Sequence, residues 1–242
     1  MEEVSNENRI LIIIISAILL ILLLPAIIFD NSIMISINGA TSHPIYTILN
    51  VLFIIETSYI HYIFVAMFFI LLLITAIAKD KTPLLEEWKI ILMVSLIAFA
   101  FEEPLINFLK IIVGRPRPFD QWPLVLFLNP LASASGYSFP SGHSSSGFCV
   151  IAPLLLKFEN RIYKILFSLF GYLTAFARVY VGVHFPTDII VGNLIGIGLG
   201  LLSYILFSNF LADKVDDKLP FIVFAITLSV YITVTIVNSL IH

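Results

Sequence analysis

The stretch ILIIIISAILLILLLPAIIF, residues 10–29, decides the fold class of this chain. It contains no charged side chain and is about 20 residues long, which is the length that an α-helix needs to cross the hydrocarbon core of a bilayer. It also lacks the small-residue cleavage site of a secretory signal peptide. We therefore expect this stretch to be a membrane-spanning helix that stays in the protein.

The whole 242-residue chain has the composition of an integral membrane protein. Hydrophobic residues make up 60% of it and charged residues 12%, whereas about 25% of the residues of a soluble domain are charged. The formal net charge of −3 indicates no polyanionic partner, so we expect no nucleic-acid binding. The single cysteine, Cys149, excludes an internal disulfide framework. We expect one membrane-embedded domain over residues 1–242.

Further apolar stretches predict an all-α, polytopic membrane helix bundle. The segment 44–55 is apolar but too short to cross, so we expect it at the interface or packed on the bundle. The linker 114–140 is rich in proline and marked by glycine, which predicts a loop. The expected spans are 9–29, 59–78, 89–112, 142–158, 162–180, 187–211 and 220–241.

Basic residues fall unevenly on the two sides of the predicted bundle. The loop 30–58 has none, whereas three loops on the opposite side carry several. Because positive charge marks the cytoplasmic side, we predict a multi-pass protein of the cell membrane with a cytoplasmic N-terminus. The loops 113–141 and 180–187 then lie outside, and their cations indicate a site. The basic residues of the inner side are Lys79, Lys81, Lys89, Lys157, Arg161, Lys164, Lys214 and Lys218.

Three short motifs gather polar side chains on this outer face. Arginine suits phosphate, because its planar fork donates two parallel hydrogen bonds. Free amide groups at a helix start also favour an anion, and Ser141 and Gly142 directly precede or open a predicted span. The motifs are KIIVGRPRP (110–118), PSGH (140–143) and RVYVGVHFPTD (178–188), and their titratable residues include Lys110, Arg117, His143, Arg178, His184 and Asp188.

This set of motifs, spanning residues 110–188, resembles the signature of the type 2 phosphatidic acid phosphatase (PAP2) superfamily. The resemblance implies a six-helix core, to which the span 220–241 would be an addition. It implies that His184 is a nucleophile, that Asp188 orients it, and that His143 is a general acid and base. It implies no metal ion or cofactor. The phosphate-binding residues that it implies are Lys110, Arg117, Ser141, Gly142 and Arg178.

The chain departs from the family pattern at two places. Ala177 stands before Arg178, where the family usually has serine, so that hydroxyl group is lost. Arg115-Pro116 also repeats the Arg-Pro pair that follows it. The spacing from Lys110 selects Arg117 as the motif residue. Arg115 then either supports the residues that bind phosphate or contacts the substrate headgroup.

Two adjacent carboxylates lie deep in the predicted span 89–112. Carboxylates inside a membrane are costly and usually face a polar interior. Glu103 precedes Lys110 by about two helical turns, so both residues share one helix face. Either Glu103 supports the cation cluster, or Glu102 and Glu103 are hydrogen-bonded residues at a kink before Pro104.

Glycine recurs every fourth residue in the predicted span 187–211, at Gly192, Gly196 and Gly200. Such a ladder lets two helices approach closely. The partner helix lies either within the bundle or across a homodimer interface.

The predicted activity is metal-independent dephosphorylation of a membrane lipid through a phosphohistidine, on the extracytoplasmic face. Family analogy favours an isoprenyl diphosphate of the undecaprenyl or dolichyl type, with phosphatidate or phosphatidylglycerophosphate as the alternative. The alternative from a different functional class is an ion or solute transporter that uses Lys110, Arg178 and Glu103. The charges cluster at one face and no repeated broken helices are visible, which disfavours the transporter.

Overall fold

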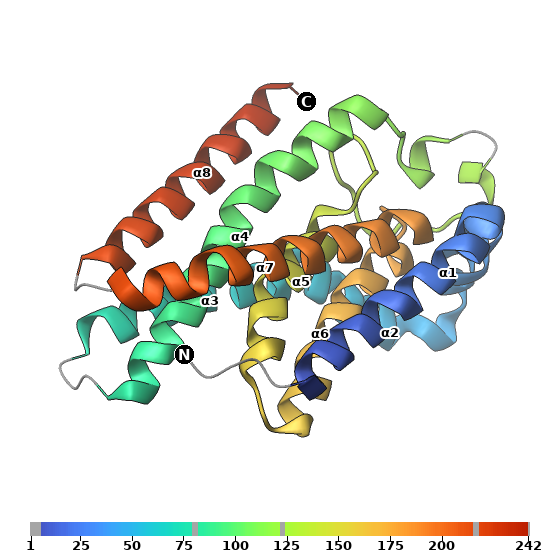
Figure 1. Cartoon of the computed structure of the whole chain (residues 1–242). Helices are drawn as coiled ribbons and strands as arrows, with labels where there is room; N and C mark the ends of the chain where they lie inside the picture. Colours follow the sequence, from blue (N-terminus) through green and yellow to red (C-terminus); the bar gives the residue numbers. More distant parts are fainter. Residues whose placement is uncertain (1–5, 79–81, 122–123, 215–217, 242) are drawn as a thin grey trace.

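The computed structural model describes residues 6–78, 82–121, 124–214 and 218–241. Their regular secondary structure is helical and includes no strand (Figure 1), so the all-α prediction is confirmed. The α-helices are α1 (Asn6–Asn38), α2 (Thr47–Ile55), α3 (His61–Ile77), α4 (Pro83–Val113), α5 (Gly142–Lys157), α6 (Arg161–Tyr180), α7 (Pro186–Lys214) and α8 (Leu219–Ile241).

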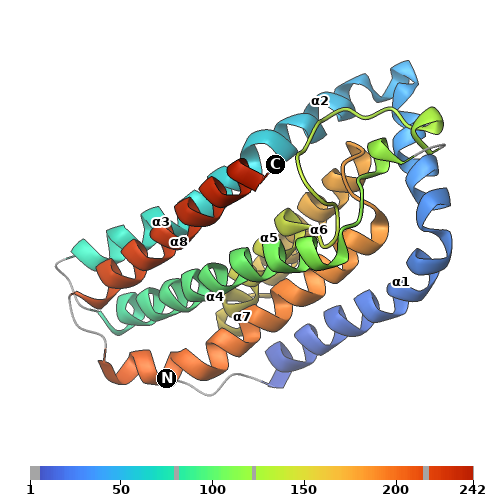
Figure 2. The same cartoon turned by 90° about the horizontal axis from the view of Figure 1, so that it is seen from above.

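The first helix is longer than predicted, and it is bent. Pro25 lies inside α1, and Phe29 has non-helical backbone angles of φ −113° and ψ 20°. Proline removes a backbone hydrogen bond and kinks a helix. The helix continues beyond the kink to Asn38, and Figure 2 shows it curving along one side of the bundle. As a result Asp30 is a buried helical residue, where the sequence predicted the start of a loop.

The predicted span 59–78 is part of a longer helical stretch. The segment 44–55 contains α2, which runs through a π-helical turn, Glu56–Ile60, directly into α3. No proline or glycine stands between residues 45 and 77, so nothing in the sequence ends the helix there. The stretch Pro44–Ile77 as a whole is long and apolar enough to cross a membrane.

The short helix α5 forms the centre of the bundle. Its 16 residues extend about 24 Å, less than the roughly 30 Å of a bilayer core. Every residue from Ser144 to Leu156 is buried, among α4, α6 and α7. By length and composition, six helical stretches of the described chain can cross a membrane, and α5, predicted as the span 142–158, is not one of them.

The glycines of α7 allow it to pack directly on the backbone of α5. A Cβ atom at Gly192 would lie 2.6 Å from the Ser141 carbonyl oxygen, and one at Gly196 would lie 2.1 Å from that of Ser145. At Gly200 a Cβ atom would approach the next turn of α5 to 2.7 Å. The ladder therefore packs within the bundle, which is the first of the two predicted interpretations.

Basic residues lie at both ends of the bundle. Lys157 and Arg161, in the turn between α5 and α6, pair with glutamates near the starts of α4 and α1. Arg178 lies near the other end of α6, about 26 Å away at 1.5 Å per residue. The basic residues of the turn between α5 and α6 and the cations of the three motifs thus occupy opposite ends of the bundle. Lys79 and Lys81, which the topology prediction also used, lie outside the described residues.

The C-terminal helix α8 lies against α3 and α4, away from α1 and α6 (Figure 2). The hydroxyl group of Thr227 donates a hydrogen bond to the carbonyl oxygen of Leu96 in α4, at 3.4 Å. This contact fixes α8 on the outside of the other helices.

Replacement of Gly196 by alanine should destabilise the protein, because its Cβ atom would meet backbone rather than a movable side chain. We expect the free energy of unfolding to fall by about 1–3 kcal/mol, the usual cost of overpacking. Gly198→Ala is the matched control, since no atom lies within 4 Å of its Cβ position. Alanine there should be neutral or stabilise by up to about 1 kcal/mol. Thermal unfolding in detergent compares the variants, and equal stabilities would contradict the packing role.

Candidate active site

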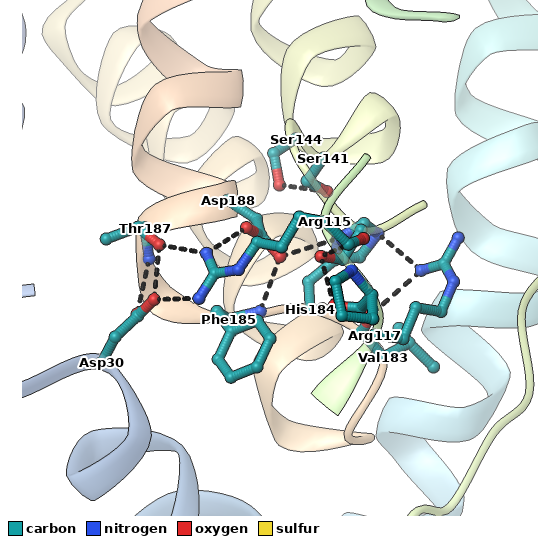
Figure 3. Close-up of polar contacts among 12 residues, drawn as sticks. Asp30, Arg115, Arg117, Ser141, Ser144, Val183, His184, Phe185, Thr187 and Asp188 are labelled. Atoms are coloured by element: carbon teal, nitrogen blue, oxygen red, sulfur yellow. Dashed lines mark hydrogen bonds and ion pairs between the residues drawn. The ribbon is translucent and has the colours of Figure 1, made fainter. Parts of the chain in front are cut away.

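Asp188, completely buried in the first turn of α7, contacts all three sequence motifs (Figure 3). Its Oδ1 atom accepts a hydrogen bond from Arg115 Nη1 at 2.7 Å. Its carbonyl oxygen accepts the N–H of Ser141 at 3.0 Å. Its Oδ2 atom accepts the N–H of Phe185 at 2.8 Å and lies 3.4 Å from His184 Nδ1. One carboxylate residue therefore brings the three motifs together.

The contacts of His184 define its tautomer. Its Nε2 atom lies 3.3 Å from Arg117 Nη1. Arginine only donates hydrogen bonds, so Nε2 carries the lone pair and Nδ1 carries the proton, which faces Asp188. The distance of 3.4 Å to Asp188 is longer than an ordinary N–H···O hydrogen bond. Asp188 thus faces the predicted ring nitrogen, but its short contacts are to other donors.

The surroundings of His184 favour its neutral form. The side chain is 2% exposed. This burial, together with the positive charges of Arg117, Arg178 and Lys110, lowers the pKa of His184 well below its ordinary value. Both causes disfavour the imidazolium ion. They favour an uncharged imidazole with its electron pair on Nε2, which is the state that a nucleophile requires.

The guanidinium group of Arg117 is held by loop carbonyl groups. Its Nε atom donates to the Gly136 oxygen at 2.9 Å, and Nη2 donates to the Ser135 oxygen at 2.6 Å. Its Nη1 atom also donates to the Val183 oxygen at 2.9 Å. Neutral acceptors position the cation without cancelling its charge, so Arg117 can still attract an anion.

Arg115 has a different environment from Arg117. Its Nη2 atom donates to Asp30 Oδ2 at 2.6 Å and its Nη1 atom to the Thr187 hydroxyl group at 2.7 Å. The guanidinium carbon lies 3.8 Å from the centre of the Phe185 ring. Protein groups therefore occupy both ends of its fork, which favours the predicted supporting role over contact with a headgroup.

Asp30 is a site residue that the motif analysis missed. Besides Arg115, it accepts the backbone N–H of Thr187 at 3.0 Å and the hydroxyl group of Thr187 at 2.6 Å. It thus anchors the start of α7 to the second half of α1. One signal was available: Asp30 is a carboxylate at the end of a long apolar run, where a charge usually has a function.

Arg178 is buried near the C-terminal end of α6. Its carbonyl oxygen accepts the N–H of His184 at 3.2 Å, so the turn after α6 holds the two residues together. Its Nε atom has no hydrogen-bond partner among the described residues. Glu56, in the π-helical turn before α3, is buried and close enough for its charge to act on Arg178. The motif analysis missed Glu56 as well, although it interrupts an apolar stretch.

The second motif supplies the start of α5, which begins at Gly142 with Ser141 as its N-cap. The N–H of Ser141, a predicted phosphate ligand, donates to Asp188 in this structure. The amides that follow it, at Gly142 and His143, belong to the first turn, which has no intrahelical acceptor. The ring of His143 packs edge-on against Tyr62, with centroids 5.2 Å apart.

A cavity of about 760 Å³ adjoins this cluster. Lys110 and His143 line it, as does Gly142, whereas His184 is not among its lining residues. Ser135 joins the two regions, because it lines the cavity and its carbonyl oxygen accepts the hydrogen bond from Arg117. The predicted site residues therefore divide between a buried cluster around His184 and the wall of an adjoining cavity.

Glu103 lines the same cavity as Lys110, in agreement with their predicted position on one helix face. Glu102 is fully buried, and its carboxylate oxygens have no hydrogen-bond partner among the described residues. The support of the cation cluster by Glu103 stays a prediction. The described residues contain no group of three or more His, Cys, Asp or Glu side chains that could hold a metal ion.

Replacement of Arg117 by glutamine should raise the pKa of His184, because it removes a positive charge that disfavours the protonated ring. Ring resonances of the five histidines, followed against pH by NMR in detergent, measure this change, and the loss of one signal in His184→Asn assigns it. Arg161→Gln is the control: its guanidinium group is exposed at the other end of α6. An unchanged His184 titration in Arg117→Gln would refute the charge coupling.

Three named relatives are similar to this chain. It is 29% identical over 146 residues to the lipid A 4'-phosphatase of Bacteroides thetaiotaomicron, covering 55% of this chain and 60% of the relative. It is 33% identical over 161 residues to phosphatidylglycerophosphatase B of Bacillus subtilis, covering 62% of this chain and 70% of that relative. It is 33% identical over 112 residues to the undecaprenyl-diphosphatase BcrC of Bacillus subtilis, covering 46% of this chain and 55% of that relative. The matched regions thus span 55–70% of the length of these relatives.

The fold is similar to a solved structure, the first transmembrane PAP2-type phosphatidylglycerolphosphate phosphatase from Bacillus subtilis. The TM-score is 0.59 at 24% identity, over 83% of this chain and 97% of that one. A profile of the PAP2 superfamily matches residues 88–212, which include all three motifs. With that match to half of its length, and with the motifs joined at one buried aspartate, the chain belongs to the PAP2 superfamily.

Proposed function

We propose that this protein is a lipid phosphatase that removes the terminal phosphate of an isoprenyl diphosphate, without a metal ion and through a phosphohistidine on His184. The observation that carries the proposal is the buried His184 ring, whose Nε2 atom lies 3.3 Å from Arg117 Nη1. Its burial and the charges of Arg117, Arg178 and Lys110 lower its pKa and favour the neutral form. Phosphoryl transfer depends mainly on positioning and charge stabilisation. This cluster offers a nucleophile and three positive charges for one phosphate group.

In the first step Nε2 of His184 attacks the terminal phosphorus, and the bond from phosphorus to the bridging oxygen breaks. Prenyl monophosphate leaves with the electron pair of that bond, and His143 donates a proton to its oxygen. Arg117, Arg178 and Lys110 balance the charge of the transferring group. Asp188 faces the Nδ1 proton and stabilises the positive charge that the ring acquires.

In the second step water attacks the phosphohistidine. His143, which lost its proton in the first step, accepts a proton from that water. The bond from phosphorus to Nε2 breaks, which releases inorganic phosphate and restores the neutral His184. Overall, one diphosphate and one water give one monophosphate and one inorganic phosphate.

Two observations support a lipid as the substrate. The site lies at the ends of helices long and apolar enough to cross a membrane, and the cavity beside it is lined mainly by apolar side chains. A prenyl diphosphate is favoured by the similarity to an undecaprenyl-diphosphatase. Phosphatidylglycerophosphate is the second candidate, because the similarity to phosphatidylglycerophosphatase B covers more of both chains.

We also propose that the site faces the extracytoplasmic side of the cell membrane. The support is the position of basic residues that lie outside the three motifs. Lys157 and Arg161 lie at the end away from the motifs, as cytoplasmic basic residues would. The cations at the motif end contact site residues and therefore say nothing about orientation.

Purified protein in detergent should release phosphate from undecaprenyl diphosphate with EDTA present. The panel includes phosphatidate and phosphatidylglycerophosphate, so the lipid with the highest kcat/KM identifies the substrate. A transporter needs a sealed membrane for its function, whereas an enzyme does not. Absence of hydrolysis on every lipid would refute the phosphatase, and loss of hydrolysis in EDTA would refute its metal independence.

The two histidines should give different defects. His184→Ala should lower kcat by about 10⁴-fold or more and leave no covalent phosphate, because the nucleophile is gone. His143→Ala should lower kcat by about 10²–10⁴-fold through loss of the general acid. Rapid quenching with labelled substrate, followed by mass spectrometry, locates the phosphohistidine. Covalent phosphate on His143 would overturn the assignment of roles.

A further inference from the structure

We propose that the cavity between α3, α4, α5 and α8 binds the prenyl tail of the substrate, and that α8 forms the wall that selects the tail. This inference rests on the proposed function, because the tail is placed by a diphosphate at the cation cluster. It adds a binding site for hydrocarbon and assigns a role to a helix that supplies no motif residue.

The cavity changes from polar to apolar along its length. Lys110 and His143, with Ser135, line it next to the cation cluster. Asn107 and Glu103 of α4 also line it, and the rest of the wall away from the cation cluster is hydrocarbon and aromatic, as a pocket for an apolar chain requires. The apolar lining includes Val65, Phe69, Ile70, Leu73, Phe99, Ile106, Phe224 and Leu228.

The cavity is lined over the same length on each of three helices. Its lining runs from Tyr62 to Leu73 on α3, from Lys110 back to Phe99 on α4, and from Thr235 back to Phe224 on α8. Each interval is about 16 Å at a rise of 1.5 Å per residue. Tyr62 contacts His143, so the α3 interval starts at the site and leads away from it. The cavity thus descends beside the site toward the middle of the bundle.

Aromatic contacts hold α8 in place as one wall of the cavity. The ring of Phe224 packs edge-on against Phe69 of α3 at 5.5 Å, and Tyr231 packs against Phe99 of α4 at 5.8 Å. Figure 2 shows α8 running beside α3 and α4. Without α8, the side chains of Phe69 and Phe99 would lose this cover and the cavity would lack that wall.

The region that matches the PAP2 superfamily ends at residue 212, and α8 begins at Leu219. The wall is therefore an addition of this chain to the matched region. A cavity of about 760 Å³ is within the usual 300–1,000 Å³ of ligand pockets. It offers one channel beside one phosphate site, which suits a lipid with a single tail. A diacyl lipid would bring two chains to the same opening.

A bulky side chain at Leu228 should block the cavity below its polar end. Leu228→Trp should leave hydrolysis of isopentenyl diphosphate nearly unchanged, because that tail ends above the block. Its kcat/KM on undecaprenyl diphosphate should fall about tenfold or more, as expected when a chain no longer fits an apolar pocket. The matched control is Ile226→Trp on the same helix, whose side chain is 57% exposed and does not line the cavity.

The ratio of kcat/KM for the long and short substrates separates the outcomes. An unchanged ratio in Leu228→Trp, or an equal fall in Ile226→Trp, overturns the tail site while the phosphatase stands. If wild-type protein hydrolyses no prenyl diphosphate, the proposed function fails instead. Preference of the wild type for diacyl lipids over prenyl diphosphates would also overturn the single-tail assignment.

A binding measurement covers the case in which Leu228→Trp does not fold. A prenyl diphosphate with a photoreactive group in its tail should label peptides of α8 and α3 in the wild-type protein. Excess undecaprenyl diphosphate should reduce that labelling about tenfold. Labelling confined to other helices, or labelling that excess substrate does not reduce, would refute the proposal. This readout does not depend on turnover.

Discussion

The buried carboxylate of Asp188 is the constraint on which the rest of the site depends. An ionised carboxylate away from water is costly unless charged groups and hydrogen-bond donors surround it. Arg115 supplies the charge and the Phe185 amide a donor, while the carbonyl group of the same residue accepts from Ser141. These partners come from the end of α4, the start of α5 and the turn before α7. The contacts that stabilise the carboxylate of Asp188 therefore also assemble the region in which His184 lies close to the cations.

This arrangement requires α5 and α7 to approach more closely than side chains permit. Gly192 lies one turn after Asp188, and a Cβ atom there would be 2.6 Å from the Ser141 oxygen. The same peptide region of α5 donates the hydrogen bond to Asp188. The glycine ladder and the catalytic geometry are thus one feature. Because the ladder removes side chains between the helices, the backbone of the second motif reaches the third.

The sequence predicted the parts of the site that local spacing determines, and it missed those that depend on distant contacts. Lys110, His143 and His184 could be selected because each lies within a short motif. Asp30 could be noticed only as a carboxylate at the end of an apolar run, since its partner Arg115 is 85 residues away and no local pattern links them. The continuity of α2 with α3 was not predicted, for a different reason: hydropathy marks what can enter a membrane, but the absence of helix breakers indicates that the helix is continuous.

In the proposed function, the residues for the chemistry and the proposed binding site for the tail come from different parts of the chain. The motif residues lie between positions 110 and 188, whereas much of the cavity wall comes from α3 and α8, outside that range. The names of the relatives indicate different lipids, from lipid A to undecaprenyl diphosphate. Each relative is only 29–33% identical to this chain. Such a division lets the phosphate site stay fixed while the helices beside it vary. A helix such as α8, added after the matched region, can reshape the apolar cavity without moving any atom that handles phosphate.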